Sequence, residues 1–129
     1  MKNYVTCQIS LAWFCAINSI DKKESLPLYK AIIKNCETLL ITAEKENNEN
    51  LLSESKLFTA ERFYDISQIA NYEQNALALK MLEKAFSLKL SVSAVKDEEL
   101  NDYLELQGEI INGEITGRTK KLNCQKTEW

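Results

Sequence analysis

The chain has 129 residues, of which 45% are hydrophobic and 27% are charged, the size and composition of one globular domain. Its formal net charge of −3 argues against general binding to nucleic acid or to anionic membrane surfaces, because both need a basic face. Three glycines and one proline are too few for a fold with many tight turns. We therefore expect long helices joined by short loops.

The first predicted helix covers residues 3–20. Its apolar side chains recur at three- and four-residue spacing, which places them on one face. They are Val5, Ile9, Ala12, Trp13, Ala16, Ile17 and Ile20. Polar residues interrupt the segment and it is too short for a membrane span, so we expect a buried helix in a cytoplasmic protein.

A second helix is predicted to begin at Ser25, which can cap free N–H groups, with Pro27 in its first turn. Its expected buried stripe is Leu28, Ile32, Cys36, Leu39, Leu40 and Ala43. A polar loop at residues 46–50 separates it from a third helix at residues 51–70. The apolar set of that helix is Leu57, Phe58, Phe63, Ile66 and Ile69. A break is expected near residues 71–75.

The fourth predicted helix covers residues 76–90 and consists largely of good helix formers. The fifth covers residues 96–112, with acids in its first turn and Gly113 as its C-cap. The side chains expected to face the core are Leu79, Leu82, Ala85, Phe86, Leu90, Leu100, Tyr103, Leu104, Gln107, Ile110 and Ile111. These elements predict an all-α, single-domain antiparallel bundle of about five helices in residues 1–116, followed by a basic, loosely ordered tail in residues 117–129.

The residues that most catalytic sites need are scarce. The chain has no histidine, which excludes Ser–His and Cys–His nucleophile pairs, and no glycine-rich phosphate loop. Its four cysteines form no C-x-x-C pair, so we interpret them as buried thiols, with a disulfide left open. Carboxylate pairs occur at Glu105/Glu109, Glu46/Glu49 and Glu99/Asp102. Magnesium-dependent helical pyrophosphohydrolases use such pairs on two helices, but Glu46 and Glu49 fall in a polar loop, far from Glu99 in the sequence. We expect no enzyme, no metal site and no cofactor.

The clearest local anomaly is a run of seven acids without any lysine or arginine among them: Asp97, Glu98, Glu99, Asp102, Glu105, Glu109 and Glu114. Like charges four residues apart destabilise a helix, so such a run needs a reason. One interpretation is a solvated face balanced by Arg118, Lys120 and Lys121. The other is a docking face for a basic protein, with Tyr103 as an aromatic anchor.

The segment Leu57-Phe58-Thr59-Ala60-Glu61-Arg62-Phe63, followed by Ala70-Asn71-Tyr72-Glu73 and Leu82-Glu83-Lys84, resembles the C-terminal half of colicin D-type immunity proteins, which include contact-dependent inhibition immunity proteins. The resemblance covers about residues 57–86. It implies a small helical protein that binds and blocks a tRNA-cleaving toxin domain, with acids that cover the toxin's basic active site. Glu61 keeps its place in this pattern, whereas Tyr64 stands where an acid is expected.

Residues 60–88 are also similar to one degenerate tetratricopeptide hairpin, through Phe63, Ile66, Ser67, Ala78, Leu82 and Ala85. A tetratricopeptide solenoid needs several copies, and no second copy is evident. This similarity therefore implies only that the two helices pack closely.

The leading hypothesis from the sequence is an immunity or antitoxin-type protein that binds a cationic toxin nuclease domain, without direct nucleic-acid binding or membrane contact. The expected partner-binding residues are Asp97, Glu98, Asp102, Tyr103, Glu105, Glu109 and Glu61. The alternative is a helical adaptor or secretion-type chaperone that binds a protein segment in an apolar groove.

Overall fold

The computed structural model describes residues 2–18, 22–73, 76–92 and 95–113, and these residues form five α-helices and no strand. The helices are α1 Lys2–Ile17, α2 Lys22–Lys45, α3 Glu49–Tyr72, α4 Leu77–Leu90 and α5 Asp97–Asn112. The prediction of an all-α single domain is confirmed. Within the described residues, no helix is both long and apolar enough to cross a membrane. The predicted tail, residues 117–129, lies outside the described part of the chain.

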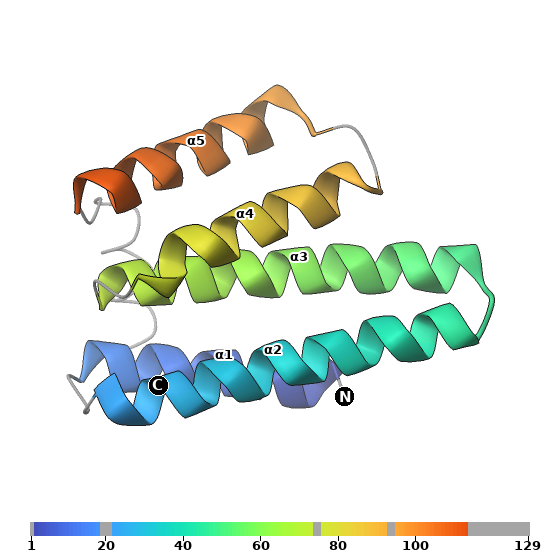
Figure 1. Ribbon diagram of the computed structural model, residues 1–129, viewed down its shortest axis with the longest axis horizontal. Coiled ribbons are helices and arrows are strands. Elements are labelled where there is room, and N and C mark those ends of the chain that lie inside the picture. The colour runs from blue at the N-terminus through green and yellow to red at the C-terminus, as the bar shows by residue number, and fades with distance from the viewer. Residues whose placement is uncertain (1, 19–21, 74–75, 93–94, 114–129) are drawn as a thin grey trace.

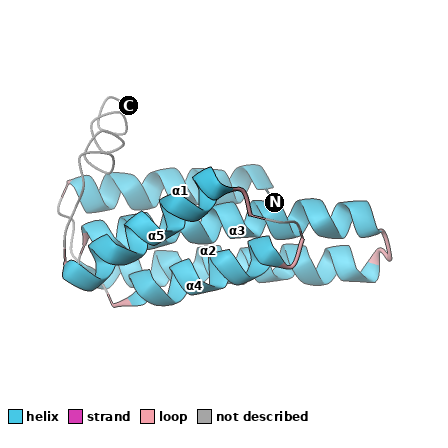
Figure 2. Cartoon of the chain, turned by 90° about the horizontal axis from the view of Figure 1, so that it is seen from above, coloured by secondary structure: helices cyan, strands magenta, loops and turns pink. Residues whose placement is uncertain are grey.

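The other four helices are arranged around α3, which packs against each of them. Figure 1 shows α1 and α2 on one side of α3, and α4 followed by α5 on the other. Figure 2 shows the same long, roughly parallel axes from above. The bundle therefore consists of two three-helix units that share α3, and the contact between α3 and α4 is the most extensive.

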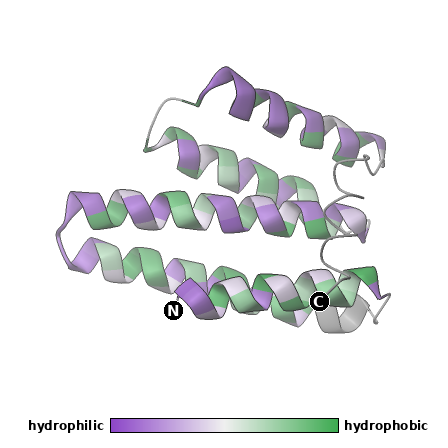
Figure 3. Cartoon of the chain, turned by 180° about the vertical axis from the view of Figure 1, so that it is seen from behind, coloured by the Kyte–Doolittle hydropathy of each residue, from purple (hydrophilic) through white to green (hydrophobic). Residues whose placement is uncertain are grey.

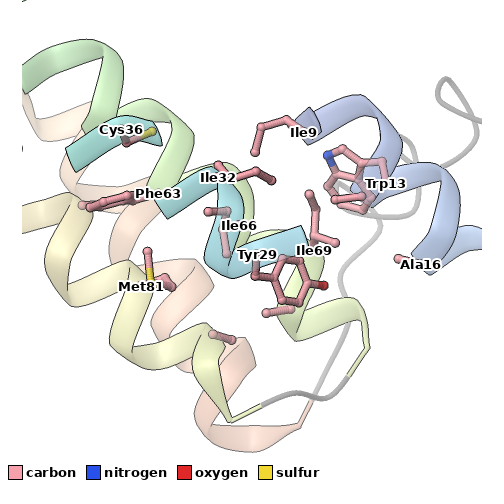
Figure 4. Close-up of a cluster of buried hydrophobic side chains, with 14 of the residues drawn as sticks. Ile9, Trp13, Ala16, Tyr29, Ile32, Cys36, Phe63, Ile66, Ile69 and Met81 are labelled. Atoms are coloured by element: carbon pink, nitrogen blue, oxygen red, sulfur yellow. The ribbon is translucent and has the colours of Figure 1, made fainter. Parts of the chain in front are cut away.

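The main core lies between α1, α2 and α3 and continues onto α4. Ile9 and Trp13 of α1 point toward Ile32 of α2 and Ile69 of α3 (Figure 4). The predicted face of α1 is confirmed at its five buried positions, which are Val5, Ile9, Ala12, Trp13 and Ala16. Ile20, predicted to continue this face, lies outside the described residues.

The N-terminus of α2 differs from the prediction. The helix begins at Lys22 instead of Ser25, so Pro27 lies in its second turn and Ser25 is inside the helix. A proline at this point costs one intrahelical hydrogen bond, because it has no N–H to donate to the carbonyl four residues earlier. Tyr29, just after this proline, is fully buried, and burial of its ring holds this end of α2 in the core.

Tyr29 also forms a buried polar contact between α2 and the end of α3. Its hydroxyl donates a hydrogen bond to the Glu73 carboxylate, directly after the end of α3. Burial, the hydrogen bond to Glu73 and the charge of that carboxylate raise the pKa of Tyr29 far above its ordinary value. Tyr29 is not among the residues predicted to be buried, because it lies beside the predicted stripe, between Leu28 and Ile32.

The loop between α2 and α3 is shorter than the predicted 46–50. Asn47 takes a positive φ of 55°, and the Asn48 side chain accepts hydrogen bonds from the N–H groups of Asn50 and Leu51. Asparagine tolerates both roles better than most residues. This cap allows α3 to begin at Glu49, two residues before the predicted start.

The hairpin between α3 and α4 is fixed by a buried hydrogen bond. The Ser67 hydroxyl donates to the Ala78 carbonyl over 2.8 Å. The small side chains of Ala78 and Ala85 are fully buried at this contact and allow the two backbones to approach. The expected break near residues 71–75 is confirmed, since α3 ends at Tyr72 and α4 begins at Leu77.

The inner face predicted for α5 is partly wrong. Leu104 and Ile111 are more than half exposed, whereas Leu106 and Glu109 are the buried residues of this helix. The helix is rotated so that Tyr103, Leu106 and Ile110 face the bundle, because the aromatic side chains of α3 and α4 contact Tyr103. Leu90, predicted to be buried at the end of α4, is also exposed.

Candidate partner-binding site

The acids of α5 form a line along one side of the helix. Glu98, Asp102, Glu105 and Glu109 follow one another at spacings of four, three and four residues, which places them on one face of an α-helix. Glu98 and Glu105 are exposed and Asp102 is partly exposed. Glu109 is only 6% exposed, so its carboxylate faces the bundle and not the solvent. Asp97 is exposed but lies off this line.

A groove of about 380 Å³ runs between α3 and the first half of α5, and it brings together three of the predicted residues. They are Glu61, Asp102 and Tyr103, two of which come from the acidic run and one from the resemblance. The end of α4 contributes Lys89. The remaining lining residues are Ala60, Arg62, Tyr64, Asp65 and Glu99.

Tyr103 forms the aromatic wall of the groove. Its ring makes edge-to-face contacts with Tyr64 of α3, at a centroid distance of 5.2 Å, and with Phe86 of α4, at 5.1 Å. Burial, and then the negative charges of Glu99 and Glu61, raise the pKa of Tyr103. The ring therefore holds α5 on the bundle, while its phenol belongs to a negatively charged surface.

Both cations of the groove are already neutralised by its acids. Arg62 contacts Asp65 at 3.0 Å and Glu61 at 3.4 Å, and its guanidinium lies over the Phe58 ring at 5.0 Å. Lys89 contacts Glu99 at 3.2 Å. Four carboxylates against two cations leave the groove with a formal charge of −2. The exposed Glu98 and Glu105 extend this negative charge along α5, beyond the groove.

Three charged residues of the groove, Asp65, Arg62 and Lys89, are not among the predicted site residues. Glu61, Tyr64 and Asp65 lie three and four residues apart on α3, so helical spacing alone predicts that they share a side. The resemblance expects an acid where Tyr64 stands, and Asp65 supplies one at the next position in the same groove. The pairing of Lys89 with Glu99 shows that the acidic run is partly balanced by a neighbouring helix. Arg118, Lys120 and Lys121, the other expected counter-charges, lie outside the described residues.

A second, apolar groove of about 130 Å³ lies on the other side of Tyr103, between α4 and α5. Leu82 and Phe86 of α4 and Leu100 and Leu104 of α5 form most of its surface. Tyr103 lines both grooves and separates them. This groove has the apolar lining that the alternative hypothesis, binding of an apolar protein segment, requires.

Among the described residues, no group of three or more His, Cys, Asp or Glu side chains is placed to hold a metal ion. Comparison of the chain with protein-family models, curated proteins and solved structures gives no match. A function is therefore inferred from the geometry of the two grooves that Tyr103 lines.

Proposed function

We propose that this chain is an immunity-type protein that binds a cationic toxin nuclease domain through the acidic groove between α3 and α5. The observation that supports this proposal is the convergence of Glu61 and Asp102 in one groove beside Tyr103. These residues come from segments about 40 positions apart, and one of them also carries the resemblance to colicin D-type immunity proteins.

The chemistry of a nuclease fits such a surface. A nuclease must hold phosphates, and it does so with lysine and arginine side chains in its active site. A carboxylate surface pairs with those side chains and excludes the nucleic acid, and it also steers the encounter between the two proteins. The protein needs no chemistry of its own for this role.

The test compares two double substitutions that change the net charge equally. Glu61→Lys with Asp102→Lys reverses the charge of the groove, whereas Glu37→Lys with Glu44→Lys alters exposed acids of α2. The probe is a tRNA-cleaving nuclease domain of a colicin D-type toxin, the partner class that the resemblance implies. Inhibition of its RNA cleavage and the association rate are measured between 50 and 300 mM salt, a range over which surface charges become increasingly screened (about 10 Å screening length at 0.1 M).

We expect the groove variant to lose inhibition, with an association rate lower by about 10-fold or more, and the α2 variant to change it by less than about 3-fold. The wild-type rate should fall steeply with salt, and the groove variant should lose most of this dependence. Equal effects of the two variants would contradict a role for the groove.

The apolar groove supports the second candidate, a helical adaptor or chaperone. Leu104→Glu places a charge at its rim and leaves the acidic groove unchanged. Loss of binding in Leu104→Glu, with unchanged binding in the Glu61→Lys and Asp102→Lys variant, would favour this candidate. The reverse pattern favours the immunity role.

A further inference from the structure

The outer side of α1 is an apolar line with coiled-coil spacing. Tyr4, Cys7, Leu11 and Phe14 follow one another at three, four and three residues, the a and d positions of a heptad. All four are exposed, with Tyr4 at 61% and Leu11 at 50%. We call these four residues the α1 seam. They lie opposite the buried face formed by Val5, Ile9, Ala12, Trp13 and Ala16.

Such a helix is unusual at the surface of a bundle. A surface helix normally carries charges on the side away from the core, but α1 has Lys2 as its single charged residue. In Figure 3 the α5 ribbon is mostly in the hydrophilic colour, whereas α1 beyond its first turn is mostly pale or apolar. Apolar surface of this kind on a helix marks an interaction site more often than it marks plain solvent exposure.

The spacing of the α1 seam indicates that its partner is another helix. Heptad a and d side chains insert between the residues of a facing helix, and they do so only when both helices carry a matching seam. Two heptads are too short to fold an isolated helix, but α1 is already held in place by the core. A second copy of the chain offers the same preformed seam.

We propose that the chain forms a symmetric dimer in which the α1 seams of two copies pack in an antiparallel pair. In the antiparallel arrangement with nearly full overlap, Cys7 lies opposite Leu11 of the other copy, and Tyr4 lies opposite Phe14. This arrangement separates the two Lys2 charges and opposes the two helix dipoles, whereas a parallel pair would bring like charges and like helix ends together. The positions flanking the seam carry no charge that opposes the contact, since Asn3, Gln8, Ser10, Cys15 and Ile17 are all neutral.

The size of the seam sets the expected strength. A 16-residue helix is about 24 Å long. Contact along one such helix falls near or below about 1,200 Å², the lower limit of specific interfaces. We therefore expect a weak dimer with a dissociation constant on the order of 10 µM. Figure 1 places α1 and α5 on opposite sides of α3, so dimer formation leaves the acidic groove accessible.

The test uses the full chain without any partner protein, so its outcome is independent of the proposed function. Sedimentation velocity under reducing conditions is recorded from about 1 to 300 µM, a range that brackets the expected dissociation constant. Leu11→Glu disrupts the centre of the seam. Ile41→Glu is the matched control, because Ile41 is an equally exposed apolar residue of α2, at 53%.

We expect the wild-type mass to rise with concentration toward twice the 14.8 kDa of the chain. Leu11→Glu should weaken the dimer by about 30-fold or more, since it buries a charge in an apolar contact. Ile41→Glu should leave it unchanged. A wild-type chain that stays monomeric at 300 µM, or a control that weakens the dimer as much as Leu11→Glu, would overturn the proposal.

Cysteine cross-linking locates the contact. Among the described cysteines Cys7 is exposed, Cys15 is partly buried and Cys36 is buried. In a Cys124→Ser background, a bismaleimide of about 8–10 Å should join two copies, because antiparallel packing separates the two Cys7 residues by about four helical positions, or 6 Å along the axis. Cys7→Ser should abolish this product. A chain ending at Gly113 should dimerise as the full chain does; dimerisation only after this truncation would show that residues 114–129 cover the seam, and it would contradict the proposal.

Discussion

The first and last helices have the same length of 16 residues, yet the bundle holds them in different ways. α1 buries five residues and carries one charged side chain, whereas α5 buries two and carries six acids. α1 is fixed by apolar burial in the main core, whereas α5 is held by the aromatic contacts of Tyr103 and by the burial of Leu106 and Ile110. The core and the acidic surface therefore lie on different helices of this fold, since the most acidic helix contributes least to the core.

The largest expected effect is on the α1 side of this comparison. Trp13 is almost fully buried and its ring lies 6.5 Å from that of Tyr72. We expect Trp13→Ala to lower the free energy of unfolding by about 3–5 kcal/mol, because it opens a cavity in the core. Urea unfolding followed by circular dichroism measures this change. Tyr4→Ala, on the exposed side of the same helix, should stay within about 0.5 kcal/mol at concentrations that keep the chain monomeric.

A smaller effect is expected for the attachment of α5. Tyr103→Ala removes two edge-to-face contacts and a half-buried ring, and we expect a loss of about 2 kcal/mol. Hydrogen exchange should accelerate in α5 more than in α1 to α3. Tyr103→Phe keeps both ring contacts and is the control, with unchanged exchange in α5. Uniform acceleration across all helices would mean that α5 is not a separately attached element.

The smallest effect concerns the buried link between α2 and the end of α3. Tyr29→Phe leaves the Glu73 carboxylate without this donor, and we expect a loss of about 1–2 kcal/mol at pH 7. The raised pKa of Tyr29 adds a pH dependence. Above pH 10 the unfolded tyrosine ionises while the folded one keeps its proton, so the wild type loses about 1.4 kcal/mol per pH unit from this group.

The Tyr29→Phe variant has no hydroxyl to ionise, so its unfolding free energy does not fall in this way. The unfolding free energies of the wild type and the variant should therefore converge between about pH 10 and pH 11. Below pH 10 ionisation of Tyr29 should not change the difference between the two unfolding free energies, because this tyrosine is protonated in both the folded and the unfolded chain. A constant difference up to pH 11 would show that Tyr29 is not held protonated in the fold.

The outcome for particular residues shows which features local pattern can predict. The buried face of α1 is predicted at its five buried positions because Val5, Ile9, Ala12, Trp13 and Ala16 recur with helical spacing. Gly113 is predicted as a C-cap and has the expected left-handed conformation, with a φ of 70°. The start of α2 and the cap at Asn48 are not predicted. Serine and asparagine are both able to cap a helix, so the sequence alone does not show whether a given one does. The surrounding packing decides that Asn48 is a cap and that Ser25 lies inside a helix.

Some features of the candidate site are likewise visible in the sequence, and others are not. The acidic run on α5 is visible in the sequence, and so is the place of Glu61 in the short motif of α3. Their meeting is not visible, since it depends on how α5 rests on α3 and α4. Lys89 belongs to a different helix, and its pairing with Glu99 has no local signal.

The sequence by itself determined that the chain forms five helices, where most of them break and that their negative charge is concentrated near the C-terminal end. The tertiary structure decided the rotation of each helix about its axis, and with it the burial of Glu109, the exposure of Leu104 and the outward position of the α1 seam. The physical reason is that backbone hydrogen bonding and helical spacing depend on neighbouring residues, whereas rotation depends on side chains of other helices that are distant in the sequence.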